Sequence, residues 1–132
     1  MAANEISQSF KPALAPGLRS QLMRAVMSIS TNVAEGAGRD SRIDFARFVT
    51  IAIASANEVE HHLTVALDLG LVDRTIGRRI VGRCIEVRRM LFGLRRALLR
   101  AAAEHGASAP PTDGESHQGE PPPPDSLREP NQ

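Results

Sequence analysis

The sequence predicts an all-α protein, an up-and-down antiparallel helical bundle of three long helices followed by a disordered C-terminal tail. The 132 residues include no Trp or Tyr and only four Phe, so a core must rely on Leu, Ile, Val and Ala. Apolar residues recur every three or four positions in three long stretches, which is the period of an amphipathic helix. Because one such rod cannot bury its own apolar stripe, rods joined by short turns pack antiparallel.

The first stretch predicts a helix over about residues 18–35. Its apolar positions are Leu18, Leu22, Val26, Ile29 and Val33. Gly36 and Gly38 follow, and glycine readily takes the positive φ that ends many helices. Residues 1–16 are too short and too interrupted by Pro to supply another long helix, so we expect an irregular N-terminal arm there.

The second stretch begins at Ser41, which together with Asp44 resembles a capping box. An apolar stripe then continues to Gly70 and predicts a helix of roughly 28 residues. The members of this stripe are Phe45, Phe48, Ala52, Ala56, Val59, Leu63 and Ala66.

The third stretch follows Asp73, whose side chain is suited to cap a helix N-terminus. Its apolar residues have nearly heptad spacing, and the helix is expected to end near His105 and Gly106. These residues are Ile76, Ile80, Cys84, Val87, Leu91, Leu94 and Leu98. The three helices form a predicted bundle domain over residues 17–105.

Residues 106–132 have a different composition, with seven Pro in 27 residues and Leu127 as the single large aliphatic side chain. Such a segment buries too little apolar surface to offset the entropy of ordering, which predicts a disordered, Pro-rich tail. Its net charge is −4. This acidic tail either keeps the protein soluble or competes for a basic surface of the same molecule.

The third predicted helix is strongly basic, because between Arg74 and Arg100 nine Arg accompany one acid, for a net charge of +8. At 100° per residue, four of these arginines fall roughly 160–200° from the apolar stripe, on the outer face, namely Arg78, Arg89, Arg96 and Arg100. Guanidinium groups bind phosphate oxygens in pairs, so this face predicts nucleic-acid binding, with an ordinary solvated helix face as the alternative. The candidate nucleic-acid-binding residues are Arg78, Arg79, Arg83, Arg88, Arg89, Arg95, Arg96 and Arg100.

The stretch "SISTNVAEGAGR", residues 28–39, places polar side chains inside a helix, where they compete with the backbone for hydrogen bonds. We interpret Ser28, Asn32, Glu35 and Gly36 as a structural corner between two helices. Small side chains there permit close approach of the helices. Asn32 and Glu35 can satisfy backbone donors at the start of the next helix, or Glu35 can pair with Arg39 or Arg42.

The stretch "RAVMSISTNVAEGAGR" (24–39), continued by "FARFVTIAIASANEVEHHLTVALDLGLV" (45–72) and "RRMLFGLRRAL" (88–98), resembles the bacterial four-helix-bundle family of 23S rRNA intervening-sequence proteins. The diversity-generating retroelement accessory protein, a basic helical-bundle pentamer that works with a reverse transcriptase and nucleic acid, is similar to this family. The resemblance spans about residues 17–100 and implies a homo-oligomer, a pentamer in that relative, with RNA or DNA and a reverse transcriptase as partners. The family pattern starts with an additional long helix that this sequence lacks.

The sequence shows no residue pattern typical of a catalytic or metal site. Glu58, His61 and His62 project away from the core stripe and have no second Glu-x-x-His partner, so we expect no metal. The sequence has no phosphate-binding loop, no Cys-x-x-Cys and no His placed to activate Cys84, which we expect to be a buried hydrophobe. We therefore expect no catalytic residues and no cofactor.

The sequence contains no secretory signal and no apolar run long enough to span a bilayer, which predicts a cytoplasmic protein without a membrane partner. The predicted function is that of a non-enzymatic, oligomeric helical-bundle protein that binds nucleic acid through its Arg-rich helix, working as an accessory to a nucleic-acid enzyme. Two alternatives are a protein–protein interaction scaffold without a nucleic-acid role and an N-terminally truncated family member.

Overall fold

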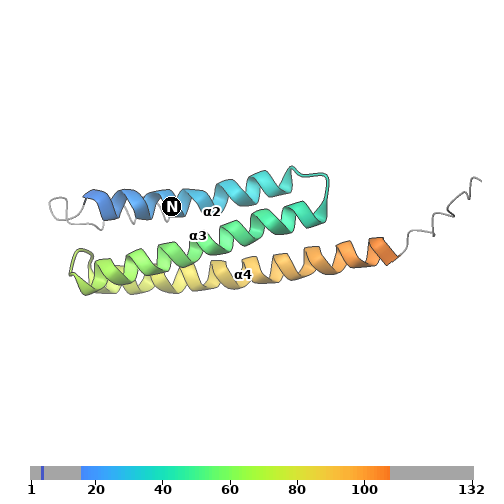
Figure 1. The fold of residues 1–132 in the computed structure, drawn as a ribbon. Coiled ribbons are helices and arrows are strands. Elements are labelled where there is room, and N and C mark those ends of the chain that lie inside the picture. The colour runs from blue at the N-terminus through green and yellow to red at the C-terminus, as the bar shows by residue number, and fades with distance from the viewer. Residues whose placement is uncertain (1–3, 5–15, 108–132) are drawn as a thin grey trace, which may run out of the picture.

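The computed structural model describes Asn4 and residues 16–107 of the chain. Its three long helices are α2 (Pro16–Ala37), α3 (Arg42–Asp68) and α4 (Arg74–Ala107). Of the predicted N-terminal arm, residues 1–3 and 5–15 lie outside the described residues, as does the tail from residue 108 onward, and Pro16 belongs to α2. The all-α, up-and-down arrangement predicted from the sequence is confirmed (Figure 1).

Helix α3 is the centre of the fold. It packs against α2 on one side and α4 on the other, whereas α2 and α4 do not contact each other through their backbones. The described helices therefore form an open layer with α3 in the middle (Figure 1).

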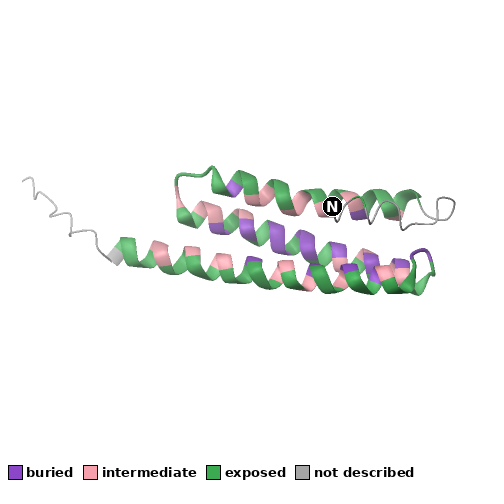
Figure 2. Ribbon diagram, turned by 180° about the vertical axis from the view of Figure 1, so that it is seen from behind, coloured by how far each residue is buried: buried purple, intermediate pink, exposed green. Residues whose placement is uncertain are grey.

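Most of the buried side chains belong to α3, as Figure 2 shows along its length. Leu22 of α2, and Val49 and Leu63 of α3, are fully buried. Fully burying a side chain of this size stabilises the fold by about 1.5–3 kcal/mol. The small residues Ala52, Ala56 and Ala66 of α3 are also fully buried. They let the neighbouring helices approach a central helix closely from two sides.

The predicted helix starts are confirmed by their hydrogen bonds. Ser41 is the N-cap of α3, and its Oγ accepts from the backbone N–H of Asp44 at 3.1 Å. Asp73 caps α4, and its Oδ1 accepts from two backbone N–H groups at 3.0 Å. Each of these bonds satisfies a donor that the first turn of a helix leaves open. Helix α4 continues through Gly106, one of the residues that the sequence assigned to the tail.

The glycines at the end of α2 have a different role from the one predicted. Within the described part of the chain, the glycine with positive φ is Gly70, at 65°, just after α3. Gly36 lies inside α2, which ends at Ala37, and a Cβ added there would lie 2.5 Å from Cδ2 of Phe45 and 2.8 Å from Cβ of Phe48. Gly36 is therefore required by the close approach of α2 and α3 rather than by a left-handed helix stop.

Candidate nucleic-acid interface

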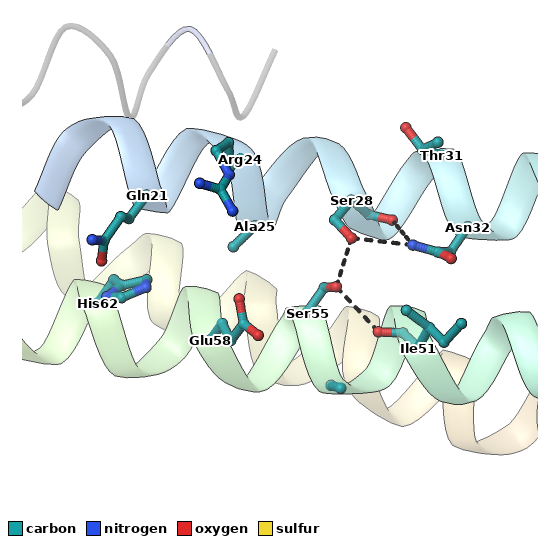
Figure 3. A pocket seen from close by; sticks show the side chains of 11 residues that line it. Gln21, Arg24, Ala25, Ser28, Thr31, Asn32, Ile51, Ser55, Glu58 and His62 are labelled. Carbon is teal, nitrogen blue, oxygen red and sulfur yellow. Dashed lines mark hydrogen bonds between the residues drawn. The ribbon is translucent and has the colours of Figure 1, made fainter. Parts of the chain in front are cut away.

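The polar residues of the 28–39 stretch form a chain of hydrogen bonds between α2 and α3 (Figure 3). The amide of Asn32 donates to Ser28 Oγ at 3.1 Å, and the Ser28 and Ser55 hydroxyls lie 2.8 Å apart. Ser55 is 5% exposed and donates to the carbonyl of Ile51 at 3.1 Å, which leaves Ser28 as the donor between the two serines. This chain accounts for Ser28 within a helix, since it satisfies a buried hydroxyl of the partner helix.

The prediction for Asn32 is corrected by these contacts. Its amide donates to the carbonyl and the hydroxyl of Ser28, one turn earlier in the same helix, and not to the start of α3. Of the partners considered for Glu35, the structure shows Arg39, whose guanidinium donates to Glu35 Oε1 at 2.6 Å. The same guanidinium lies 4.7 Å from the ring centroid of Phe48 and so links the end of α2 to α3. A cation over an aromatic face adds a modest attraction to this corner.

Arg42, the other partner considered for Glu35, instead connects α3 to the C-terminal end of α4. Its guanidinium donates to the carbonyl of Ala101 at 3.1 Å and lies 2.8 Å from Nδ1 of His105. Positive charge beside a helix C-terminus is favourable, because the last carbonyls of the helix carry partial negative charge.

An open groove of about 660 Å³ lies between α2 and α3 beside this hydrogen-bonded chain (Figure 3). Arg24 and Glu58 extend into it from opposite walls, and His62 lies at one end. Their opposite charges largely offset each other, so this groove offers little net attraction to a polyanion. No group of three or more metal-ligating side chains occurs among the residues that the structure describes.

The outer face of α4 carries four exposed arginines at the positions that the helical projection placed there. Arg78, Arg89, Arg96 and Arg100 are exposed, and none of them has a hydrogen-bond or ion-pair partner within the described ranges. We call these four residues the outer arginine row. It is a strip of cationic groups directed into solvent.

The other predicted arginines of α4 have different surroundings. Arg88 forms an ion pair with Glu60 of α3, in which each side chain is 29% exposed, and it also donates to Asn57 Oδ1 at 3.0 Å. It therefore holds α4 against α3. The side chain of Arg95 lies over the Phe92 ring at 5.3 Å from its centroid. Arg79 and Arg83 are exposed and make interactions of their own.

Sequence reasoning did not identify the partners of Arg88 or the serine pair. Glu60 and Asn57 appeared only as residues of the second helix, and Ser55 carried no signal beyond being a polar residue near an apolar stripe. The sequence signal that could have identified these partners is a polar or charged residue close to the buried face of a helix. Such a residue is often paired with a group of a neighbouring helix.

Cys84 is buried, as predicted, and its thiol donates to the carbonyl of Ala56 at 3.1 Å. Removal from water raises the pKa of the Cys84 thiol, and the nearby Glu60 carboxylate raises it further. Both effects disfavour the thiolate, which is the reactive form of cysteine. The residue is a structural thiol of the α3–α4 contact.

We expect Cys84 in the native protein to react with a chromogenic disulfide reagent at least about tenfold more slowly than in urea. Because the folded pKa lies above the usual 9.0, the unfolded chain loses its thiol proton first as pH rises. The free energy of unfolding should therefore fall as the pH passes the unfolded pKa and stay unaffected by this group below it. Reaction rates in buffer and in urea, with urea titrations on both sides of that pH, measure these effects. Equal rates in the two solvents would contradict the burial.

No helix within the described ranges is long and apolar enough to cross a membrane. In the longest of these helices, α4, charged residues occur along the whole length.

A family model described as "23S rRNA-intervening sequence protein" matches residues 1–93, a range that begins earlier than the predicted resemblance. Among solved structures, a protein of unknown function from the S23 ribosomal protein family of Bacteroides thetaiotaomicron is similar, with a TM-score of 0.60 and 21% identity. The match covers 72% of this chain and 98% of that chain, and at this identity it shows the fold alone. No curated protein matches the chain.

Proposed function

The chain belongs to the 23S rRNA-intervening sequence protein family, and from this premise we propose that it is a non-enzymatic bundle that binds nucleic acid through the outer arginine row of α4. The observation that carries the proposal is the exposure of Arg78, Arg89, Arg96 and Arg100 on one helix face without partners within the described part of the chain. Four unpaired guanidinium groups on one rigid helix are suited to a phosphate backbone, since each can bind phosphate oxygens in pairs.

The spacing of the row supports this binding. Arg78 and Arg100 are separated by 22 residues of continuous helix, or about 33 Å at 1.5 Å per residue. Such a length spans roughly one turn of duplex nucleic acid, so the row can meet several phosphates without bending either partner. No base-reading element is implied, because contacts to phosphate carry no sequence information.

We further propose that the protein acts as a homo-oligomer and as an accessory to a nucleic-acid enzyme. The described helices form an open layer, and large apolar side chains remain exposed on it, including Met90 at 66% and Phe92 at 40%. An open layer that leaves such side chains uncovered favours contact with another chain. Assembly would also place several arginine rows on one particle, which increases avidity for a long polyanion.

Light scattering of the purified protein across a salt series, with and without a short duplex RNA, tests the proposal. We expect a particle larger than one chain, and RNA binding whose log K falls with log salt at a slope of about −5 if about six phosphates are neutralised. A flat salt response, or no binding at low salt, would leave the interaction scaffold as the better description. A single chain in solution would remove the oligomer.

A further inference from the structure

A shallow groove of about 180 Å³ lies between the first half of α3 and the last third of α4. Ile43 and Leu99 provide its apolar walls, and they are 51% and 47% exposed. Arg47 and Arg95 also line it. The groove is therefore an apolar notch with cationic neighbours, which is a suitable site for a large aliphatic side chain flanked by acids.

The positive charge around this notch is in excess. Arg47 pairs with Asp44 at 2.9 Å, yet the Arg47 side chain remains 75% exposed. Two members of the outer arginine row, Arg96 and Arg100, follow Arg95 by one and five positions. Neither has a partner among the described residues. An acidic segment bound in the notch would therefore gain from several cations and would cover one end of the row.

The chain itself contains a segment with the complementary chemistry. Residues 108–132, which follow α4 directly, have a net charge of −4 and contain Leu127 as their one large aliphatic residue. Asp125 and Glu129 lie two residues before and after Leu127, and Arg128 lies between Leu127 and Glu129, so the local net charge is −1. The remaining negative charge comes from Asp113, Glu115 and Glu120 earlier in the segment, and the whole segment offers an aliphatic anchor with excess acid.

The length of the segment allows this contact. Leu127 lies twenty positions after Ala107, and at the polyproline II rise of about 3.1 Å per residue that Pro-rich segments favour, this length can reach up to about 60 Å. Leu99 lies eight residues before Ala107 in α4, or about 12 Å along the helix axis. Tethering at this distance gives an effective concentration in the millimolar range, so even a weak contact is populated.

We propose that the segment around Leu127 docks in the Ile43–Leu99 notch and that its acids compete with nucleic acid for the adjacent arginines. The tail is then an intramolecular polyanion mimic that weakens non-specific binding, and a strong nucleic-acid ligand displaces it. The docking stands on the notch and on charge complementarity, whereas its effect on binding rests on the proposed nucleic-acid function.

Docking is tested in the full chain without nucleic acid. A spin label on Ser126→Cys, in a Cys84→Ala background, should broaden the backbone amide signals of Ile43, Thr50 and Leu99 at low salt. The signals should recover at high salt. The matched control is the same labelled chain with a neutral tail, which keeps the length and every proline. It carries Asp113→Asn, Glu115→Gln, Glu120→Gln, Asp125→Asn, Arg128→Gln and Glu129→Gln, which removes all five acids and the one Arg of the tail.

The docking would be overturned if the signals of Ile43, Thr50 and Leu99 are not broadened, or if they are broadened equally in the neutral-tail control. Amides of Gln21 and Glu58, which line the groove between α2 and α3, should stay sharp in both chains. Equal broadening of those amides would show a tail without a preferred site and would overturn the proposal as well.

The functional consequence is tested with the same short duplex RNA. We expect the neutral-tail chain to bind about three- to tenfold more tightly than the native chain at low salt, with the difference vanishing as salt rises. Leu127→Ser should show a smaller gain, because it removes the apolar anchor and keeps the charge. Site-specific broadening without RNA binding by either chain would refute the proposed function and leave the docking intact. RNA binding with no broadening would refute the docking alone.

Discussion

Replacing all four members of the outer arginine row, Arg78, Arg89, Arg96 and Arg100, by Gln is expected to lower the affinity for a short duplex RNA by about a thousandfold at about 0.1 M salt. The slope of log K against log salt should change from about −5 to about −2, because each lost phosphate contact removes about 0.9 from it. Both quantities come from one salt series of fluorescence anisotropy titrations.

Within the described part of the chain these side chains have no structural task, so the loss of affinity reflects the lost phosphate contacts and not a disturbed fold. All four are exposed and lack partners among the described residues, so removing their charge leaves the packing of α4 unchanged. Arg88 is different, since its ion pair with Glu60 joins α4 to α3, and it is left in place for this reason. An unchanged melting temperature should accompany the lost affinity.

A matched control distinguishes the contribution of the outer arginine row to RNA affinity from the contribution of the net charge of the protein. Arg19 and Arg24 are exposed on α2, and their replacement by Gln removes two charges, the same number that Arg89→Gln together with Arg96→Gln removes from the row. We expect this control to reduce affinity by no more than about fivefold at the same salt, through the long-range field alone. If the control weakens binding as much as that pair from the row does, the α4 face is not the interface.

Gly36→Ala is expected to lower the free energy of unfolding by about 1–3 kcal/mol, although Ala is the better helix former by about 1 kcal/mol. A Cβ at this position would lie 2.5 Å from Cδ2 of Phe45 and 2.8 Å from Cβ of Phe48. The ring can rotate, but the Phe48 Cβ is attached directly to the backbone of α3. The two helices must therefore separate locally.

Gly82→Ala is the matched control, because it makes the same change inside α4 where an added Cβ meets no atom within 4 Å. There we expect a gain of about 0.5–1 kcal/mol from helix propensity. Urea titrations followed by circular dichroism measure both changes. Two substitutions with the same sign would show that the α2–α3 approach does not limit the size of residue 36.

The sequence predicted the helices well because helix formation depends on residues close to one another in the chain. The apolar spacing located all three helices, and Ser41 and Asp73 marked two helix starts whose capping bonds are present. The outer position of the arginine row followed from the same periodicity. The prediction that Gly36 ends the helix with a positive φ was wrong, because what requires a glycine there is the close approach of the phenylalanine side chains of another helix.

By itself, then, the sequence determined the helical class, the helix ends set by local caps and which face of each rod is apolar or cationic. Only the tertiary structure decided that α3 lies between α2 and α4, that Ser28 meets Ser55, and that Arg88 meets Glu60 while its neighbours face solvent. The reason is one of distance along the chain. Periodicity and capping act within one or two helical turns, whereas these pairings join residues 27 and 28 positions apart, and the packed register of antiparallel helices selects them.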